Sequence, residues 1–243
     1  MKISMVDDKN LACIKASELL HEQILKKPNS TIGLATGNTM TGVYQAFKVL
    51  VKNHPTDLSQ VRLVMLDEYW DIDINHPASF KSYLLDALDG LGLNQSQFHF
   101  HRTDLPPDEA TVFYNDTIKK LGGIDLQFLG IGVNGHIAFN EPGTPFLETT
   151  HVIKLTESTI KANEKDFKGA FPTMAITMGI QNIMEANSII LIALGESKAQ
   201  IIKEALSGEV SENCPASILQ RHANLTVILD PAAAQKIKDK SDW

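Results

Sequence analysis

The stretch SIILIALGESKAQIIKEALSG, residues 188–208, joins an apolar run to a helical pattern through a short polar turn. The run Ser188–Leu194 is almost continuously apolar, which is typical of a strand buried on both faces of a parallel sheet. The following segment, Ser197–Leu206, begins at a serine and ends near Gly208, which is a common capping pattern of a helix. This stretch therefore predicts one strand–helix unit of an α/β fold.

The same alternation continues along the whole chain. Further strand-like runs occur at Lys2–Val6, Thr31–Leu34, Val61–Leu66, Asp125–Leu129 and Leu225–Leu229. Helical spacing of apolar residues between them is clearest in two sets, which are Val43, Phe47, Leu50 and Val51, and Ala110, Phe113, Tyr114 and Leu121. The alternation predicts a Rossmann-like α/β fold, with a doubly wound, mostly parallel sheet and helices on both faces. Ligands of such sheets bind beyond the carboxyl ends of the strands.

The length of 243 residues fits one domain, and the sequence contains no repeat, low-complexity segment or long linker. We therefore expect a single domain spanning residues 1–243. The stretch from Pro142 to Pro172 lacks clear strand character, and it could form a mobile lid over the site.

Composition excludes several classes of function. The net charge of −7, without a basic stripe, argues against a nucleic-acid surface. No apolar run approaches the ~20 residues that span a membrane, and the N-terminus does not resemble a signal peptide, so we expect a soluble, cytoplasmic protein. Cys13 and Cys214 lack metal or redox spacing and are expected to be reduced, packed thiols. His99 and His101 would share a strand face, but without a third ligand we expect surface or edge residues and no metal site.

Three segments that follow strands carry candidate chemistry. The first is ATGNTMTG, residues 35–42, where Gly37 permits a tight turn and Thr36, Asn38 and Thr39 add polar donors before a helix. Free N–H groups at a helix start form an anion cradle. The loop lacks the GK[ST] element of a Walker motif. A hydroxyl-rich helix cap is the alternative interpretation.

The second segment is LDEYW, in which Asp67 and Glu68 directly follow an apolar run. Paired acids in this position commonly cap a helix or face solvent. At the carboxyl edge of a sheet, one of them can instead serve as a general base. The sequence leaves both interpretations open.

The third segment is FLGIGVNGHIAFNEPGTP, residues 128–145. It formally matches the dinucleotide pattern GxGxxG, but that pattern must open a helix, whereas here prolines follow quickly. The glycines instead allow the backbone to approach a ligand. His136 lies in a polar turn with Asn134 and Glu141 nearby, which offers an acid–base group with two orienting partners. A buried structural histidine is the alternative.

These three segments, in this order, resemble the glucosamine-6-phosphate deaminase family, also called glucosamine-6-phosphate isomerase. The resemblance covers essentially the whole chain, with LATGNT similar to the phosphate loop, LDEYW to the acid loop and GIGVNGHIAFNEPGT to the family signature. The NEP portion distinguishes it from the 6-phosphogluconolactonases, which share the fold and a GxDGH-like turn. After the NEP portion, Pro145 and Ile153 stand where larger, allosteric members carry a serine and a lysine, so the chain resembles the short, non-allosteric type.

The resemblance implies a role for each matching position. Asp67 matches the base that moves a proton between C2 and C1, His136 matches the residue that opens the sugar ring, and Glu141 matches its partner. Asn134 stands where many members carry aspartate. The phosphate is expected on Thr36, Gly37, Asn38 and Thr39, with Lys165 and Lys198 as its cations. Lys165 replaces an arginine of larger members and so loses the bidentate fork.

The implied activity is the isomerisation and deamination of glucosamine 6-phosphate with water to fructose 6-phosphate and ammonia, in amino-sugar catabolism. This reaction requires no cofactor and no metal. The expected partner is the amino sugar phosphate alone, with no nucleic acid or membrane, and the protein is expected to be a monomer or small homo-oligomer. The alternatives are a 6-phosphogluconolactonase-like hydrolase and a sugar-phosphate sensor, although the retained acids disfavour the sensor.

Overall fold

The computed structural model describes residues 1–157, 159–160 and 171–237, and it contains two sheets. The larger sheet has seven strands in the order β1-β10-β9-β6-β2-β3-β5, and every neighbouring pair is parallel. The strands are β1 (Lys2–Met5), β2 (Thr31–Leu34), β3 (Arg62–Met65), β5 (Phe98–His99), β6 (Leu126–Leu129), β9 (Ile189–Ala193) and β10 (Leu225–Leu229). The predicted parallel α/β sheet is confirmed, and its six expected strands agree within a residue at either end.

The order of the strands reverses next to β2. From β2 the chain continues to β3 and β5 on one side, while β6, β9 and β10 lie on the other side. The switch point of this doubly wound sheet therefore lies between β2 and β6. Loops that leave neighbouring strands in opposite directions open a crevice at such a point, which is where ligands bind in open α/β sheets.

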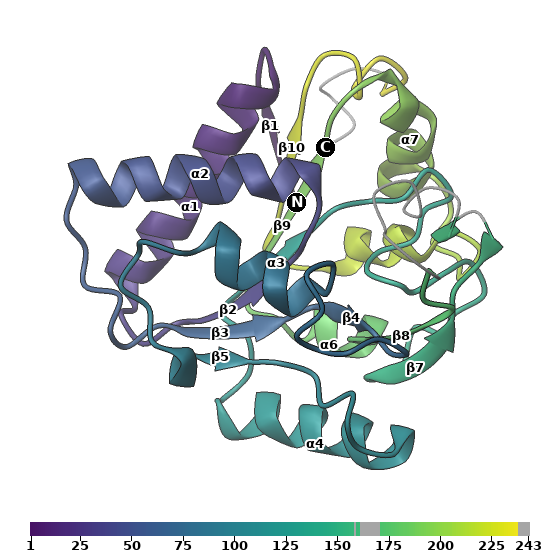
Figure 1. Cartoon of the computed structure of the whole chain (residues 1–243). Helices are drawn as coiled ribbons and strands as arrows, with labels where there is room; N and C mark the ends of the chain where they lie inside the picture. The colour runs from purple at the N-terminus through teal and green to yellow at the C-terminus, as the bar shows by residue number, and fades with distance from the viewer. Residues whose placement is uncertain (158, 161–170, 238–243) are drawn as a thin grey trace.

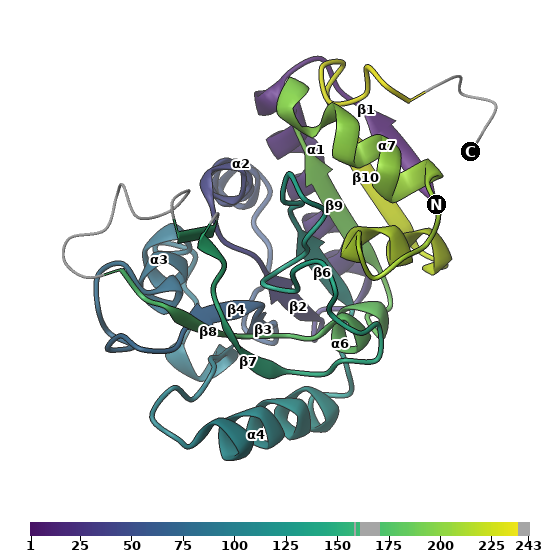
Figure 2. The same cartoon turned by 90° about the vertical axis from the view of Figure 1, so that its right-hand side faces the viewer.

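Helices cover both faces of the larger sheet, as predicted. Figures 1 and 2 show α1 (Lys9–Lys26) and α2 (Asn38–Asn53) on one side of β1, β10 and β9, and α7 (Ala199–Ser207) on the other. Further helical elements among the described residues are α3 (Phe80–Ala87), η1 (Gln95–Gln97), α4 (Pro107–Lys120), α6 (Ile180–Met184), η3 (Glu196–Lys198) and η4 (Pro215–Arg221).

Two helix details differ from the sequence expectation. Ser197 does not cap the helix that ends at Gly208, because it lies inside the short 3-10 turn η3, and α7 begins only at Ala199. Gly208 is the C-terminal cap, as expected. On α4, Ala110 and Tyr114 are buried, but Phe113 is exposed and is not part of the apolar face.

The smaller sheet is antiparallel, with the order β4-β8-β7, and it was not predicted. It consists of β4 (Asp67–Tyr69), β8 (Met174–Thr177) and β7 (His151–Lys154), with α4 packed beside β7 (Figures 1 and 2). Two interpretations are therefore wrong. LDEYW enters a strand rather than a loop, and the 142–172 stretch does contain a strand. Both strands are too short for periodicity alone to reveal them.

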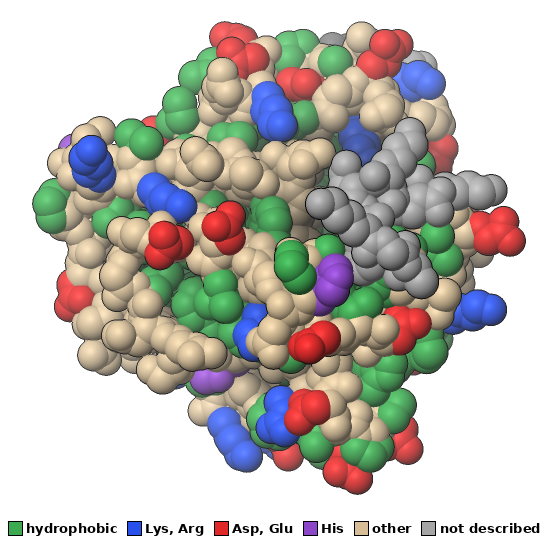
Figure 3. Space-filling model, in the orientation of Figure 1, with side chains coloured by type: hydrophobic (Ala, Val, Ile, Leu, Met, Phe, Trp, Pro, Cys, Tyr) green, Lys and Arg blue, Asp and Glu red, His purple; other side chains and the backbone are tan. Residues whose placement is uncertain are grey.

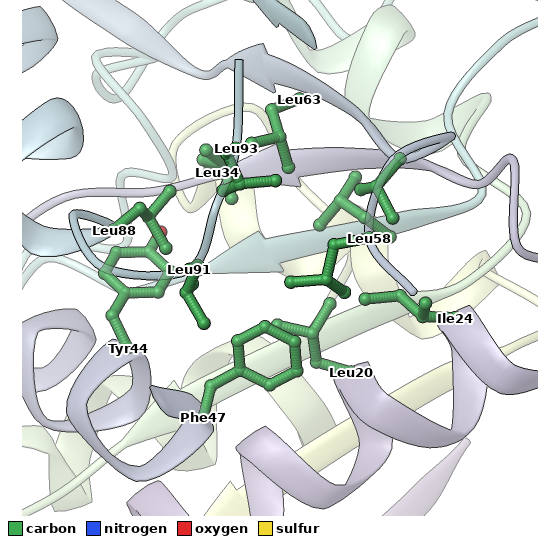
Figure 4. Close-up of a pocket in the computed structure, with 12 residues that line it drawn as sticks. Leu20, Ile24, Leu34, Tyr44, Phe47, Leu58, Leu63, Leu88, Leu91 and Leu93 are labelled. Atoms are coloured by element: carbon green, nitrogen blue, oxygen red, sulfur yellow. The ribbon is translucent and has the colours of Figure 1, made fainter. Parts of the chain in front are cut away.

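The apolar core lies mainly between the larger sheet and its helices. Next to β2 and β3, under α1 and α2, it contains a cavity of about 20 Å³ lined by apolar side chains such as Leu20, Tyr44 and Phe47 (Figure 4). Without polar partners, this cavity cannot hold a charged ligand. It is a packing defect of the core and not a binding site.

His101 corrects another expectation. Instead of lying at the surface, it is 1% exposed, and its ring stacks on Tyr114 with 3.7 Å between the ring centroids. Burial lowers its pKa to about 3, so the ring is neutral. His99 is half-buried on the edge strand β5. In the part of the chain that the structure describes, no three His, Cys, Asp or Glu residues gather as a metal site would require.

The surface and the helices bear on two further expectations. On the face shown in Figure 3, Lys and Arg side chains are interspersed with Asp and Glu. Within residues 1–157, 159–160 and 171–237, none of the helices combines the length and the apolar character needed to cross a membrane. Both cysteines are free thiols, with Cys13 buried and Cys214 half-buried.

Candidate active site

The phosphate-loop candidates line one pocket at the switch point of the larger sheet. This pocket has a volume of about 170 Å³ and lies at the carboxyl ends of β2, β6 and β9. Its lining includes the residues that the sequence indicated, which are Thr36, Gly37, Asn38, Thr39 and Lys198. Backbone from the ends of β6 and β9, at Gly130 and Leu194, completes it. The structure thus brings together segments that lie more than 150 positions apart in the sequence.

The loop after β2 presents the start of a helix to this pocket. Gly37 has a φ of 101° and precedes the first residue of α2, Asn38. A side chain is strained at that φ, which explains the glycine. The first N–H groups of a helix have no partner within the helix and carry a partial positive charge, so they suit an anion. The N-terminal cap of α2 is Gly37, and no described side chain makes a capping hydrogen bond there, so the alternative of a hydroxyl-rich cap is wrong.

Lys198 reaches the pocket from the opposite strand end. Its Nζ donates a hydrogen bond to the carbonyl of Ile131 at 2.7 Å, in the loop that follows β6. The side chain is half-buried, and burial lowers its pKa. The hydrogen bond to a carbonyl fixes the ammonium group while leaving two of its three protons for another acceptor.

The two acids of β4 have different surroundings. Asp67 is 7% exposed, and of the residues that the structure describes none donates a hydrogen bond to its carboxylate. Burial, together with the negative charge of Glu68, raises the pKa of Asp67 to about 8. A carboxylate with this pKa is a stronger base than an ordinary aspartate and exchanges its proton close to neutral pH.

Glu68 points the other way and caps a helix. Its Oε1 accepts the backbone N–H groups of Tyr69 and Phe80 at 2.8 and 2.9 Å, and its Oε2 accepts that of Lys81 at 2.8 Å. Phe80 and Lys81 open α3. Each acid therefore fits one of the two interpretations, because Glu68 caps the helix and Asp67 is left as the candidate general base.

Asn134, His136 and Glu141 meet as the sequence predicted. The Asn134 amide donates to Oε2 of Glu141 at 2.7 Å, and Nδ1 of His136 lies 3.5 Å from the same oxygen, an ion-pair distance that is long for a hydrogen bond. The side-chain oxygen of Asn134, Oδ1, accepts the backbone N–H of His136 at 3.2 Å. The amide therefore acts as a donor to Glu141 and as an acceptor for the backbone, and an aspartate could not fill both roles.

Glu141 is held on its other side by two threonines that sequence reasoning missed. Thr159 and Thr156 donate to Oε1 at 2.7 and 3.2 Å. Burial alone would raise the pKa of Glu141, but contacts with His136, Thr159 and Asn134 outweigh it and lower the pKa to about 2. The carboxylate is therefore ionised throughout the physiological range. No local pattern in the sequence connects these threonines with Glu141.

The position of His136 depends on a glycine. A Cβ built on Gly132 would lie 2.2 Å from the His136 ring, so only glycine allows the ring to pack against this backbone. Ala138, two residues further on, has a φ of 53°, which is uncommon for a residue other than glycine. Such strain concentrates at functional sites.

The acid strand and the histidine loop are joined through β8. Asp67 pairs with Thr177, whose hydroxyl accepts the backbone N–H of Phe139 at 3.2 Å. The Asn140 amide donates to the carbonyl of Met178 at 2.9 Å. These contacts place Asp67 beside the segment that carries His136 and Glu141. Lys165, the second expected phosphate cation, lies outside the described residues.

Comparison with known proteins identifies the family of the chain. Residues 10–228 match the family described as glucosamine-6-phosphate isomerases/6-phosphogluconolactonase. The chain belongs to this family. Within it, the chain is 41% identical to a glucosamine-6-phosphate deaminase of Clostridium novyi over 245 residues, covering 98% of this chain and 100% of that protein. It is also 41% identical to glucosamine-6-phosphate deaminase 2 of Bacillus subtilis, covering 99% of both.

Solved structures of the family agree with this assignment. The chain is similar to a monomeric glucosamine-6-phosphate deaminase with a TM-score of 0.93 and 34% identity, covering 97% of this chain and 100% of that one. It is also similar to a 6-phosphogluconolactonase of Trypanosoma brucei with a TM-score of 0.77 and 19% identity, covering 97% and 98%. The second likeness shows the shared fold alone.

Proposed function

We propose that this protein converts glucosamine 6-phosphate and water into fructose 6-phosphate and ammonia, in amino-sugar catabolism in the cytoplasm. Its full-length similarity to proteins named glucosamine-6-phosphate deaminase supports this activity. The observation that carries it is the presence of two separate acid–base groups, the buried, weakly acidic Asp67 and the ordered His136–Glu141 pair. The isomerisation needs a base that removes a proton from carbon, and the cyclic form of the sugar needs a separate group that opens its ring.

The substrate phosphate binds in the pocket at the ends of β2, β6 and β9. Thr36, Gly37, Asn38 and Thr39 offer hydroxyl, amide and helix N-terminal donors, and Lys198 supplies a positive charge from the opposite side. Lys165 is proposed as a second cation on the strength of the family resemblance. Hydrogen bonds to charged groups contribute about 1.5–3 kcal/mol each, so a few residues suffice to bind the phosphate group.

His136 opens the pyranose ring. Because the ionised Glu141 carboxylate only accepts, it favours the tautomer with the proton on Nδ1, and Nε2 is left to exchange a proton with the sugar. The ring opens when the C1 hydroxyl loses a proton and the ring oxygen gains one. Asn134 and the two threonines keep Glu141 in place while His136 changes charge.

Asp67 then transfers a proton between neighbouring carbons. Its carboxylate removes the proton from C2, the electron pair forms the C1–C2 double bond of the enolamine, and the C1 oxygen takes up a proton. The acid then returns its proton to C1 while the amino group loses one, which gives the 2-imino sugar. Water adds to this imine and the nitrogen leaves as ammonia, so the products are fructose 6-phosphate and ammonia. A pKa near neutrality allows one group to accept and to donate the proton.

A panel of sugar phosphates tests the proposal directly. Purified protein is incubated with glucosamine 6-phosphate, 6-phosphogluconolactone and N-acetylglucosamine 6-phosphate, and ammonia and fructose 6-phosphate are measured. We expect equal amounts of both products from glucosamine 6-phosphate alone. Acid release from the lactone without ammonia from the amino sugar would instead show a lactonase. Light scattering tests the further proposal, supported by the monomeric relative, that the 26.8 kDa chain is a monomer.

A further inference from the structure

Helix α3 connects the two halves of the site, and Glu68 fixes its first turn. The Glu68 carboxylate is 0% exposed and accepts three backbone N–H groups, one from its own strand β4 and two from α3. These donors offset part of the cost of burying the carboxylate. The strand that carries Asp67 and the start of α3 are thereby joined.

The next turn of α3 contacts the phosphate loop. The Tyr83 hydroxyl donates to the carbonyl of Gly37 at 3.0 Å, and Thr41 Oγ1 lies 2.8 Å from the same hydroxyl. Thr41 can donate to Tyr83 while Tyr83 donates to Gly37, so both protons are used. These bonds cross between α3 and the start of α2.

The orientation of one peptide explains why this contact matters. The C=O of Gly37 and the N–H of Asn38 belong to the same planar unit and point in opposite directions. A hydroxyl that holds the carbonyl therefore also fixes the direction of the N–H. The same carbonyl also accepts the backbone N–H of Thr41 at 3.0 Å within α2, and the bond from Tyr83 adds the link between this peptide and α3.

We propose that Glu68 and Tyr83 are positioning residues that, acting through α3, hold the phosphate loop and the strand of Asp67 in one fixed arrangement. The inference rests on the proposed function, because it assigns to this helix the distance between the phosphate loop and Asp67. An error of about 1 Å between a base and a bound substrate costs about 10²-fold in rate.

The surroundings of Asp67 supply a signature for Glu68. The titratable groups that interact electrostatically with Asp67 are Glu68 and Tyr69 on its own strand and, from α4, Tyr114. His101 packs against Tyr114 and is neutral. Both tyrosines have raised pKa values and are also neutral, so Glu68, whose own pKa burial raises to about 7, is the nearby group that can carry a negative charge. Removing that charge lowers the pKa of Asp67.

Tyr83→Phe tests the contact with the phosphate loop. We expect the Kd for inorganic phosphate, measured by calorimetry, and the KM for glucosamine 6-phosphate to rise about three- to tenfold, the usual effect of one lost hydrogen bond. The matched control is Tyr114→Phe, which removes a buried hydroxyl of α4 that is bonded to the carbonyl of Met65 and should leave phosphate binding unchanged.

Glu68→Gln tests the other end of α3. We expect weaker phosphate binding and a shift of the acid limb of kcat/KM toward lower pH. Asp125→Asn is its control, since Asp125 is another buried carboxylate that accepts a backbone N–H, from Thr31 at the start of β2. It should lose comparable stability without either effect. In the double variant of Glu68 and Tyr83, the fold-increase of the phosphate Kd should be smaller than the product of the two single fold-increases. The reason is that both residues act through one helix.

The outcomes separate this inference from the proposed function. Unchanged phosphate Kd and KM in Tyr83→Phe, with an active parent enzyme, would overturn the role of α3. A parent protein that releases no ammonia, while its phosphate Kd still responds to Tyr83→Phe but not to Tyr114→Phe, would reject the deaminase and retain the positioning role. If Glu68→Gln does not fold, the comparison of Tyr83→Phe with its control Tyr114→Phe tests the role of α3.

Discussion

The proposed phosphate pocket and the proposed acid–base cluster are built differently. The pocket is lined by residues at the ends of β2, β6 and β9, with Lys198 as its described cation. The acid–base cluster consists of side chains whose order depends on hydrogen bonds from other segments, as at Glu141. Parallel strands align their own ends, whereas an irregular loop needs partners. The first region should therefore tolerate substitution better than the second.

The comparison extends to the ionisation of the buried carboxylates. Asp67 is nearly without donors, and its pKa is raised, whereas Glu141 has donors on both oxygens, and its pKa is lowered. Burial raises the pKa of both groups; the charge of Glu68 adds to this effect at Asp67, whereas hydrogen bonds and the charge of His136 outweigh it at Glu141. One acid is thus suited to exchange a proton and the other to remain charged.

The largest effect is expected from removing the base. Asp67→Asn should lower kcat by about 10²–10⁴-fold, the usual contribution of a general base, with little change in KM. Exchange of the C2 hydrogen with solvent, followed by NMR, should disappear with turnover. Exchange that continues at the parental rate would identify another base. Asp125→Asn serves as the control for the loss of a buried carboxylate.

A smaller loss is expected from Asn134→Asp, which replaces a donor to Glu141 by a second carboxylate 2.7 Å away. We expect kcat/KM to fall about 10- to 100-fold, because a lost bond to a charged group costs about 1.5–3 kcal/mol. The variant should partly recover at low pH, where one of the two acids is protonated. Full activity at neutral pH would show that Glu141 does not need the amide.

Lys198→Ala tests the pocket. KM for glucosamine 6-phosphate should rise about 10-fold or more with a smaller change in kcat, since the lost bond contributes to phosphate binding. Lys203→Ala is the matched control, because Lys203 is exposed on the same helix region, five positions further on. If both variants behave alike, the phosphate binds elsewhere.

A milder effect concerns stability against pH. The pKa of Asp67 rises from 3.8 to about 8 on folding, so between these values the folded state binds a proton that the unfolded chain lacks, and stability falls as pH rises. The amide introduced by Asp67→Asn stays neutral, so the Tm of this variant should exceed that of the parent increasingly from pH 4 to pH 8. For Glu141 the sign is opposite, and its contribution is lost as pH falls from 4.5 toward 2. Calorimetry over pH measures both.

No effect is expected from N-acetylglucosamine 6-phosphate as an activator. Ile153, at the position of a lysine in larger members, packs into an apolar cluster with Tyr69 and Phe139, and His151 is bonded to the carbonyl of Thr149. An effector shifts an equilibrium only if it binds two states differently. Initial rates should be hyperbolic with and without it. A sigmoidal curve that the effector makes hyperbolic would show a regulatory site built from other residues.

The parallel sheet and the polar loops at its strand ends were predictable from the order of the residues alone. Buried parallel strands must be apolar along their whole length, and turns that hold anions need glycine and hydroxyl residues, so segments such as Ile189–Ala193 and Thr36–Thr39 carry their own signal. The pairing of Asn134, His136 and Glu141 was also predictable, because they lie within one short segment.

The different surroundings of the individual acids, in contrast, arise from contacts that form on folding. Glu68 and Asp67 are neighbours in a strand, where successive side chains point to opposite faces, and no pattern in the sequence shows that one face meets α3. The small sheet, the threonines on Glu141 and the contact of Tyr83 with Gly37 likewise join distant segments. Local propensity reflects interactions between neighbours in the chain, whereas these contacts exist only after folding has brought separate segments together.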